Sequence, residues 1–182
     1  MKDLVFVFNE KELLDSVYYS FAHSKAFQSI KKKGKIALFI LVLALGGVLF
    51  TLDKLIGCLF WGVGIVFCFF FSKYLIFYYK IYFKKFLKQE AYQKQVGQRV
   101  SIHFDDTFFQ THYEHSEHKY DYQSIDSINE TKENFFVKIN SVLYIVFPKS
   151  QLDDIQELKA YFQALCEKYM IKYTEELDWT WR

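Results

Sequence analysis

Two long apolar runs dominate the pattern of hydrophobic and polar positions along this chain. Residues 36–52 and 55–72 contain no charged residue, and only Asp53 and Lys54 separate them. At about 1.5 Å rise per residue, each run forms a helix slightly shorter than the roughly 30 Å hydrocarbon core, and snorkelling lysines can offset the deficit. The runs therefore predict a transmembrane helical hairpin with a tight turn at residues 51–54. The alternative is a buried hairpin of a soluble protein, which two adjacent runs of this length disfavour in so small a chain.

Lysines gather on the outer flanks of both runs and are balanced in the turn between them. Those before the first run are Lys25, Lys31, Lys32, Lys33 and Lys35, and those after the second are Lys73, Lys80, Lys84, Lys85 and Lys88. Because cytoplasmic flanks carry the excess of lysine and arginine, this distribution predicts that both termini are cytoplasmic. Residues 1–30 lack the apolar core of a signal peptide, so we expect the first span to be retained.

The helical pattern continues beyond the second run as a mixture of lysines and aromatic residues. In residues 73–96, Lys73, Lys80, Lys84 and Lys88 fall on one helical stripe. Aromatic rings and lysine stems suit the headgroup level of a membrane, where anionic lipids attract lysines. Two interpretations remain open: a helix that contacts lipid or a partner, or a simple extension of the anchor. The predicted membrane-interface residues are Lys31, Lys32, Lys33, Lys73, Lys80, Lys84, Lys85 and Lys88.

Small residues inside the two runs suggest how the helices meet. Gly47 with Thr51 and Cys58 with Gly62 form pairs four residues apart, which allow helix backbones to approach closely. We expect these pairs to join the two helices within one chain. Neither run contains an ionisable residue, which argues against a channel or a transporter.

Outside the hairpin, the chain begins with a strand pattern and a helix pattern. Residues 4–8 alternate as a strand, and Asn9 with Glu12 has the spacing of a capping box at a helix N-terminus. The following helix is amphipathic, and we expect it to pack on a later sheet.

From Arg99 the hydrophobic period changes to two, which predicts about six antiparallel strands. The last of them, residues 142–147, is apolar on both faces and is therefore expected to be central. Pro148 ends it, and Ser150 is the expected cap of a final helix with an apolar stripe. For the tail, an extra strand, contact with the membrane surface and disorder all remain open.

These elements predict an α+β membrane protein in which a hairpin interrupts one small antiparallel β domain, a barrel or sandwich closed by a C-terminal helix. The predicted divisions are 1–35 for the N-terminal strand and helix, 36–79 for the hairpin with a juxtamembrane helix to about 96, 99–170 for the sheet domain, and 171–182 for the tail.

Composition narrows the possible functions. A formal net charge of +2 gives no indication of nucleic-acid binding, and the three cysteines form neither a disulfide pattern nor a CxxC metal motif. His112, His115 and His118 are three residues apart, and on a helix this spacing could place them on one face to bind a metal ion. The surrounding period of two instead places them at an exposed hairpin tip, so we predict no metal. No catalytic motif appears, and we expect neither enzyme activity nor a cofactor.

The layout resembles the YcxB-like proteins. The resemblance is carried by an aromatic at Tyr122 followed by Ile125, Ile128 and Glu130, by the Phe135–Phe136 pair, and by residues 143–149 leading into a helix with Leu152 and Phe162. Tyr122 stands where tryptophan is expected. The resemblance implies a bacterial two-span protein of the cytoplasmic membrane with a pleckstrin-homology-like domain, and it implies no catalytic residue.

Two functions are compatible with these patterns. The first is a membrane-anchored, cytoplasmic-facing binding or regulatory module that recognises a protein partner or an anionic lipid at the inner leaflet. The second, by analogy with other small two-span proteins, is an immunity protein that neutralises a toxin. Survival of cells exposed to the cognate toxin would separate the two.

Overall fold

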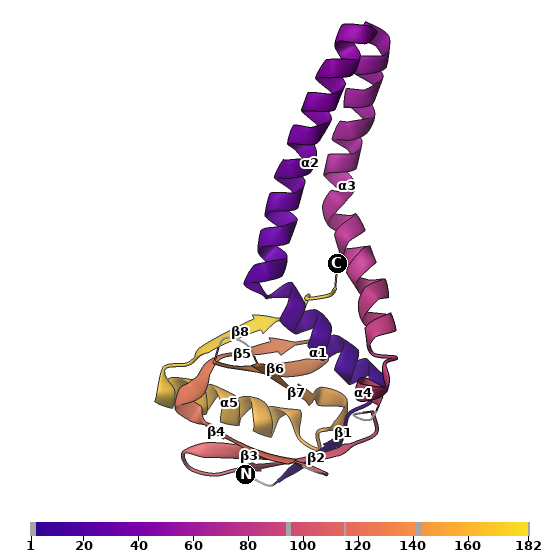
Figure 1. Ribbon diagram of the computed structural model, residues 1–182. Coiled ribbons are helices and arrows are strands. Elements are labelled where there is room, and N and C mark those ends of the chain that lie inside the picture. The colour runs from indigo at the N-terminus through magenta and orange to yellow at the C-terminus, as the bar shows by residue number, and fades with distance from the viewer. Residues whose placement is uncertain (1–2, 94–95, 115, 141–142, 182) are drawn as a thin grey trace. The chain divides into compact units, whose positions relative to one another are not determined.

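The structure is a computed structural model that describes residues 3–93, 96–114, 116–140 and 143–181. The chain divides into two compact units, one formed by residues 1–20 and 84–180 and the other by residues 21–83 and 181–182. Figure 1 shows two long helices together with sheets and a C-terminal helix, and the protein is of the α+β class. We call the unit of residues 1–20 and 84–180 the sheet unit, and the unit of residues 21–83 and 181–182 the hairpin unit.

The hairpin unit contains helices α2 (Lys25–Leu52) and α3 (Lys54–Phe86). Both are long and apolar enough to cross a membrane. In the most apolar 18-residue stretch of each helix, only 11% of the residues in α2 and 17% in α3 are buried. The tight turn is confirmed and consists of Asp53 alone. Its Oδ1 accepts hydrogen bonds from the backbone N–H groups of Leu55 (2.8 Å) and Ile56 (3.1 Å), which caps α3.

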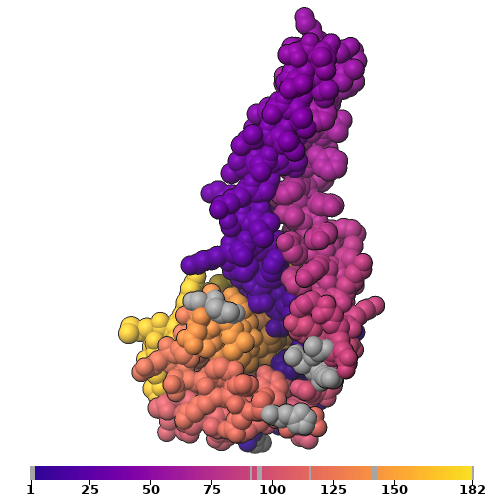
Figure 2. All heavy atoms as spheres, viewed as in Figure 1, coloured from indigo at the N-terminus to yellow at the C-terminus, as the bar shows by residue number. Residues whose placement is uncertain are grey.

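Glycines bring the two helices together, but they are not the glycines that the sequence pattern indicated. A Cβ atom at Gly64 would lie 2.3 Å from the Val42 side chain, and one at Gly57 would lie 2.5 Å from the Phe50 backbone. Added Cβ atoms at Gly47 and Gly62 would meet nothing within 4 Å, so the prediction for those two positions was wrong. The helices touch near their shared turn (Figure 2).

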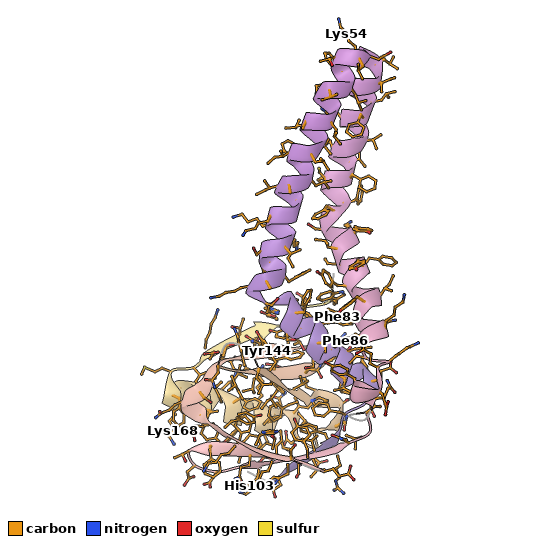
Figure 3. The ribbon with its side chains drawn as sticks, viewed as in Figure 1. Lys54, Phe83, Phe86, His103, Tyr144 and Lys168 are labelled. Atoms are coloured by element: carbon orange, nitrogen blue, oxygen red, sulfur yellow. The ribbon has the colours of Figure 1, made fainter. Side chains whose placement is uncertain are left out.

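The hairpin side chains project outward along most of both helices, with Lys54 at the turn (Figure 3). The break between the preceding helix and α2 lies at residues 23–24, where Ser24 caps α2 by accepting a hydrogen bond from the Phe27 N–H (3.1 Å). The predicted division at residue 35 therefore falls inside α2.

In the sheet unit, the first sheet is an antiparallel meander in the order β1-β2-β3-β4. Its strands are β1 (Leu4–Val7), β2 (Arg99–Phe104), β3 (Phe108–Tyr113) and β4 (Ser116–Asp121). The N-terminal strand thus pairs with residues almost a hundred positions later, with Leu4 opposite Ile102.

The second sheet has the order β7-β6-β5-β8. Its strands are β5 (Ile125–Thr131), β6 (Asn134–Ile139), β7 (Leu143–Pro148) and β8 (Lys172–Glu176). The tail therefore contributes a strand, and β8 runs parallel to β5. The prediction that β7 is central was wrong, because β7 lies at the edge and owes the burial of its outer face to a helix.

That helix is α1 (Glu10–Ala22), whose Tyr19 ring stacks on Phe136 of β6 at 3.8 Å and packs with Val146 of β7. The Tyr19 hydroxyl donates to Glu176 of β8 (3.0 Å). One of the two hydrogen bonds of the capping box is confirmed, since Glu12 Oε2 accepts from the Asn9 N–H (3.1 Å).

Helix α5 (Ile155–Tyr169) packs Leu158, Phe162 and Leu165 into the same core as both sheets. Its N-cap is Asp154, which accepts from the N–H groups of residues 156 and 157, so the prediction of Ser150 was wrong. Ser150 lies in the short helix η2 (Lys149–Gln151). The remaining short helices are α4 (Glu90–Gln93) and η1 (Tyr122–Ser124).

Candidate functional site

The predicted membrane-interface lysines lie mainly on the surfaces of the two long helices. Lys31, Lys32 and Lys33 are on α2, and Lys73, Lys80, Lys84 and Lys85 are on α3. All except the half-buried Lys31 are exposed. Helix α3 ends at Phe86, so the predicted continuous helix to residue 96 is wrong, and Lys88 lies in the following turn rather than on the helical stripe.

Within the hairpin unit, the lysines of the two helices come at a common level. A Cβ atom at Gly34 of α2 would lie 2.9 Å from the Phe71 ring of α3, which sets these residues opposite each other. Lys33 and Lys35 therefore lie at the height of Lys73. Both charge-free runs end at one level, as expected where two spans leave the same side of a bilayer.

An aromatic cluster lies beyond the ends of the two charge-free runs, in the lysine-containing parts of the hairpin unit. Phe21, Phe27, Tyr79 and Phe83 form successive ring contacts, with centroids 4.6–4.9 Å from Phe21 for its three partners. Trp181 joins the cluster, stacking on Phe27 at 5.8 Å and donating its Nε1–H to the Ile76 carbonyl (3.2 Å). Trp181 thus belongs to the hairpin unit.

The described histidines do not form one set of ligands. His118 pairs with Thr111 across β3 and β4, whereas His112 pairs with Glu117, so His112 and His118 face opposite sides of the sheet. His112 Nδ1 lies 3.5 Å from Glu117 Oε2. His118 belongs to a strand rather than to the predicted tip, and His115 lies outside the described residues. Over the described ranges, no three His, Cys, Asp or Glu side chains are grouped to hold a metal.

A cleft of about 580 Å³ lies beside strand β7 in the sheet unit. Its walls are residues 143–146 of β7, Tyr113, Ser116, His118 and Tyr120 of the β3–β4 hairpin, Leu13 and Ser16 of α1, and Phe8 with Gln98. This volume lies within the range of about 300–1,000 Å³ that is usual for ligand sites. We refer to it as the β7 cleft.

The lining of the β7 cleft combines apolar surface with hydrogen-bonding groups. Burial raises the pKa of Tyr113 and Tyr144, so both phenols stay protonated at neutral pH and can donate hydrogen bonds. Apolar and aromatic side chains form most of the lining, with a few hydroxyl and amide groups among them. An apolar lining with a few polar groups is typical of ligand-binding pockets.

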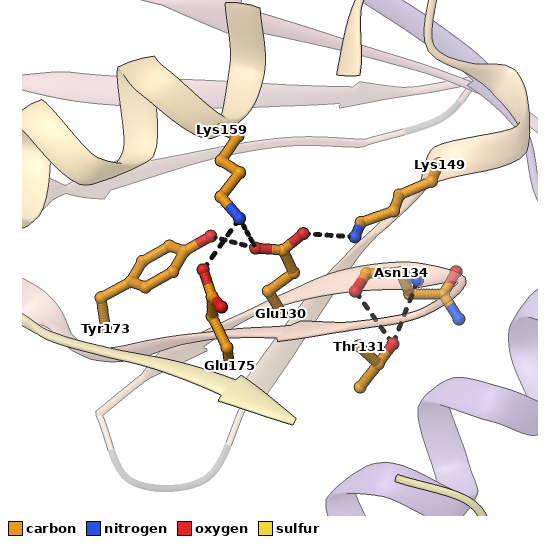
Figure 4. Close-up of polar contacts among 7 residues, drawn as sticks. All are labelled: Glu130, Thr131, Asn134, Lys149, Lys159, Tyr173 and Glu175. Carbon is orange, nitrogen blue, oxygen red and sulfur yellow. Dashed lines mark hydrogen bonds and ion pairs between the residues drawn. The ribbon is translucent and has the colours of Figure 1, made fainter. Parts of the chain in front are cut away.

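A second polar cluster has a structural geometry. The Glu130 side chain is 5% exposed, and its carboxylate pairs with Lys149 (2.5 Å) and Lys159 (2.9 Å) while accepting from the Tyr173 hydroxyl (2.7 Å). Glu175 binds Lys159 at 2.8 Å (Figure 4). Burial alone would raise the pKa of Glu130, but the hydrogen bonds from Lys149, Tyr173 and Lys159 outweigh it and lower that pKa. The cluster links β5, η2, α5 and β8, with every charge compensated.

Sequence reasoning missed the cleft and this ion pair for different reasons. Glu130 and Lys149 were both recognised as residues of the family pattern, but nothing in the spacing showed that they form a pair. The cleft depends on how two sheet edges and a helix meet, and the sequence carries no local signal of that arrangement.

Residues 104–164 match the family model described as YcxB-like protein. This match confirms the resemblance to YcxB-like proteins over that segment. It covers the end of β2 through most of α5 and includes Glu130, Lys149 and Lys159. No curated protein and no solved structure matches the chain.

Proposed function

We propose that the protein is a membrane-anchored binding module without catalytic activity, whose sheet unit captures a partner protein at the cytoplasmic face of a bacterial membrane. The observation that carries the proposal is the β7 cleft, an open and mostly apolar cavity on a unit in which the buried Glu130 carboxylate is already paired with Lys149. The module would be the described sheet unit, and the hairpin would hold it at the inner leaflet.

The anchoring part of the proposal is supported by the outward-facing apolar surface of α2 and α3. Leu52, Leu59 and Phe69 are 79%, 62% and 77% exposed, which is costly in water and favourable in lipid. The common level of Lys33, Lys35 and Lys73 supports a single membrane boundary with both termini on the cytoplasmic side.

The proposal includes a pleckstrin-homology-like fold for the sheet unit, as the resemblance implies. The succession of a four-stranded meander, the meander β5–β7 and the closing helix α5 supports this assignment. Strand β8, added parallel to β5, is an extension of that plan.

Thiol labelling tests the anchor and its orientation. In a Cys58→Ala background, Asp53→Cys should react with a membrane-impermeant maleimide added to intact spheroplasts, and Lys168→Cys should react only after permeabilisation. Buried Cys166, whose thiol pKa burial raises to about 11, should contribute little background. Labelling of Lys168→Cys in intact spheroplasts would contradict the proposed orientation.

Affinity purification tests the binding function. Tagged full-length protein extracted from host membranes in mild detergent should recover one protein in near-equal amount, and Leu143→Glu should abolish that recovery. Leu177→Glu is the matched control, since Leu143 and Leu177 are 44% and 48% exposed and only Leu143 lines the cleft. A toxin as the recovered partner would assign the module to self-protection. Recovery of anionic lipid alone would contradict capture of a protein.

A further inference from the structure

Positive charge in the hairpin unit is concentrated where both charge-free runs end. Residues 21–83 include eight lysines and a single acidic residue, Asp53. Asp53 lies in the turn, roughly 27 Å along α2 from Lys35 and roughly 30 Å along α3 from Lys73. It is therefore too distant to pair with either lysine. The end of the hairpin away from its turn carries an excess of positive charge.

Three exposed lysines share one level at this end. Gly34 of α2 faces the Phe71 ring of α3, which an added Cβ atom would approach to 2.9 Å. Lys33 and Lys35 stand one residue before and one residue after Gly34, so they leave α2 on opposite flanks, about 100° from the face that meets α3. Lys73 lies two residues beyond Phe71. We call Lys33, Lys35 and Lys73 the lysine belt.

The Lys73 side chain shows how the belt meets the apolar surface. Its ammonium lies over the ring of Phe70, 5.5 Å from the ring centroid, and Phe70 is 51% exposed. Side chains on a helix tilt toward its N-terminus, which for α3 is the turn, so Lys73 reaches back along the second charge-free run. Aromatic rings and lysines are typical of the headgroup level of a bilayer. The belt therefore borders the surface that the anchor would bury in lipid.

Two other lysines of the hairpin unit stand away from this level. Lys25 is ten residues before Lys35 on α2, and Lys80 is seven residues after Lys73 on α3. These spacings correspond to roughly 15 Å and 11 Å along the helices, away from the charge-free runs. Both exceed the Debye length of about 10 Å at 0.1 M salt, so attraction to charges at the boundary is weakened. The belt lysines are better placed than Lys25 and Lys80 to contact such charges.

Charge complementarity identifies the ligand of the belt. Lysines near a membrane surface attract phospholipids of net negative charge, and each contact is worth about a fivefold preference. A zwitterionic phospholipid offers the same phosphate but balances it with an ammonium group of its own. The belt therefore distinguishes phospholipids by their net charge.

We propose that the lysine belt binds anionic phospholipids, such as phosphatidylglycerol, in preference to zwitterionic phospholipids at the cytoplasmic boundary of the hairpin. The inference rests on the anchoring part of the proposed function and adds a lipid ligand to it. Lys33 and Lys35 contact headgroups on the two flanks of α2, and Lys73 contacts them beside α3. The anchor thereby selects the lipids that surround it.

Electron spin resonance of spin-labelled lipids measures this preference directly. Full-length protein is reconstituted in phosphatidylcholine bilayers with a trace of chain-labelled phosphatidylglycerol or chain-labelled phosphatidylcholine, and the fraction immobilised beside the protein is compared. At 0.1 M salt, phosphatidylglycerol should associate about fivefold more strongly, as expected for a lipid that contacts one lysine. At 1 M salt, where the Debye length falls to about 3 Å, the two lipids should become nearly equal.

Matched double variants test the position of the site. Lys35→Gln with Lys73→Gln should reduce the preference to about twofold, because one lysine of the belt remains. Lys25→Gln with Lys80→Gln also removes one lysine from each helix, and it should leave the preference near about fivefold. Association of labelled phosphatidylcholine should be the same in all variants, which verifies that the hairpin is intact.

Two results would overturn the proposal. The first is equal association of the two labelled lipids with the wild-type protein at 0.1 M salt. The second is an equal loss of preference in the two double variants, because the attraction would then come from the overall charge of the protein rather than from the belt.

Failure of this inference is distinct from failure of the proposed function. Absence of immobilised lipid of either kind would refute the membrane anchor and the belt together, whereas immobilised lipid without a preference would refute the belt and leave the anchor standing. A preference for phosphatidylglycerol without a protein partner in the affinity purification would support the belt and refute capture of a protein.

Discussion

The hairpin unit and the sheet unit use similar residues in opposite ways. Phe69 on α3 is 77% exposed, whereas Phe135, Phe136 and Phe147 in the second sheet are fully buried. Transfer of a phenylalanine side chain out of water is favourable. The exposed fractions therefore indicate whether each unit is stable in water or needs an apolar surrounding. The sheet unit makes its own apolar interior, whereas the hairpin leaves most of its apolar side chains uncovered, and this contrast supports the proposed membrane anchor.

The two units also differ in what brings their elements together. In the hairpin, Gly46, Gly57 and Gly64 let side chains of the facing helix approach the backbone closely. In the sheet unit, interlocking aromatic rings such as Phe135 and Phe162, 5.5 Å apart, fill the space between strands and α5. The hairpin should therefore be sensitive to larger residues at these glycines, and the sheet unit to truncation of its buried rings.

The largest expected difference between the units concerns phenylalanine truncation. Phe135→Ala should cost about 3–5 kcal/mol, because it leaves a cavity next to Phe162 and removes the ring under the Lys149 ammonium (4.5 Å). Phe69→Ala should leave the sheet unit unchanged. Amide hydrogen exchange of β6, measured in detergent, would report the stability of the sheet unit in both variants. A similar loss of protection in Phe135→Ala and Phe69→Ala would refute the difference between the two units.

Loss of the buried Glu130 carboxylate should destabilise the sheet unit almost as much. Glu130→Gln should destabilise the sheet unit by about 3 kcal/mol, since it leaves the 11%-exposed Lys149 without its counter-ion. Glu133→Gln is the control, because the Glu133–Lys11 pair is exposed (57% and 68%) and worth under about 1 kcal/mol. Urea unfolding would measure both, and equal shifts would argue that burial of Glu130 is unimportant.

Glycine substitution tests the hairpin interface. Gly64→Leu should destabilise the hairpin by about 1–3 kcal/mol, because its side chain would displace Val42. Gly62→Leu adds the same side chain on an open face and should be tolerated. Thermal unfolding of the full-length protein in detergent, followed by helical circular dichroism, would compare the two. Equal sensitivity would contradict the observed helix-packing face.

The smallest expected effect is a pH dependence of the sheet unit. The folded-state pKa of Glu130 is lowered below its ordinary 4.5, so its stabilising contribution is complete above that value and is lost as pH falls through the lowered pKa. Glu130→Gln should therefore flatten the acid limb of a stability profile. Burial raises the pKa of Asp15, so Asp15→Asn should remove a contribution of opposite sign, one that makes the fold more stable as pH falls. Stability profiles that neither substitution changes would contradict both assignments.

The sequence alone determined the features that depend on neighbouring residues. The charge-free length of residues 36–52 and 55–72 was sufficient to predict two helices with a tight turn, and the spacing of Asn9 and Glu12 predicted a cap that the structure contains. The family pattern from Tyr122 to Lys149 was recognisable from a short run of residue types, and residues 104–164 match the YcxB-like family model. In each case the signal and the structure lie within one short segment.

Only the tertiary structure decided which strands are edges and what lies beside them. Strand β7 is apolar on both faces because α1 covers one of them, so its pattern is that of a central strand although it lies at the edge of its sheet. Likewise, β8 joins β5 and Glu130 meets Lys149 only once distant segments have been brought together. Hydrophobic periodicity records whether a side chain is covered, but it does not record which element covers it or whether the backbone has a neighbour. The β7 cleft depends on that second kind of information.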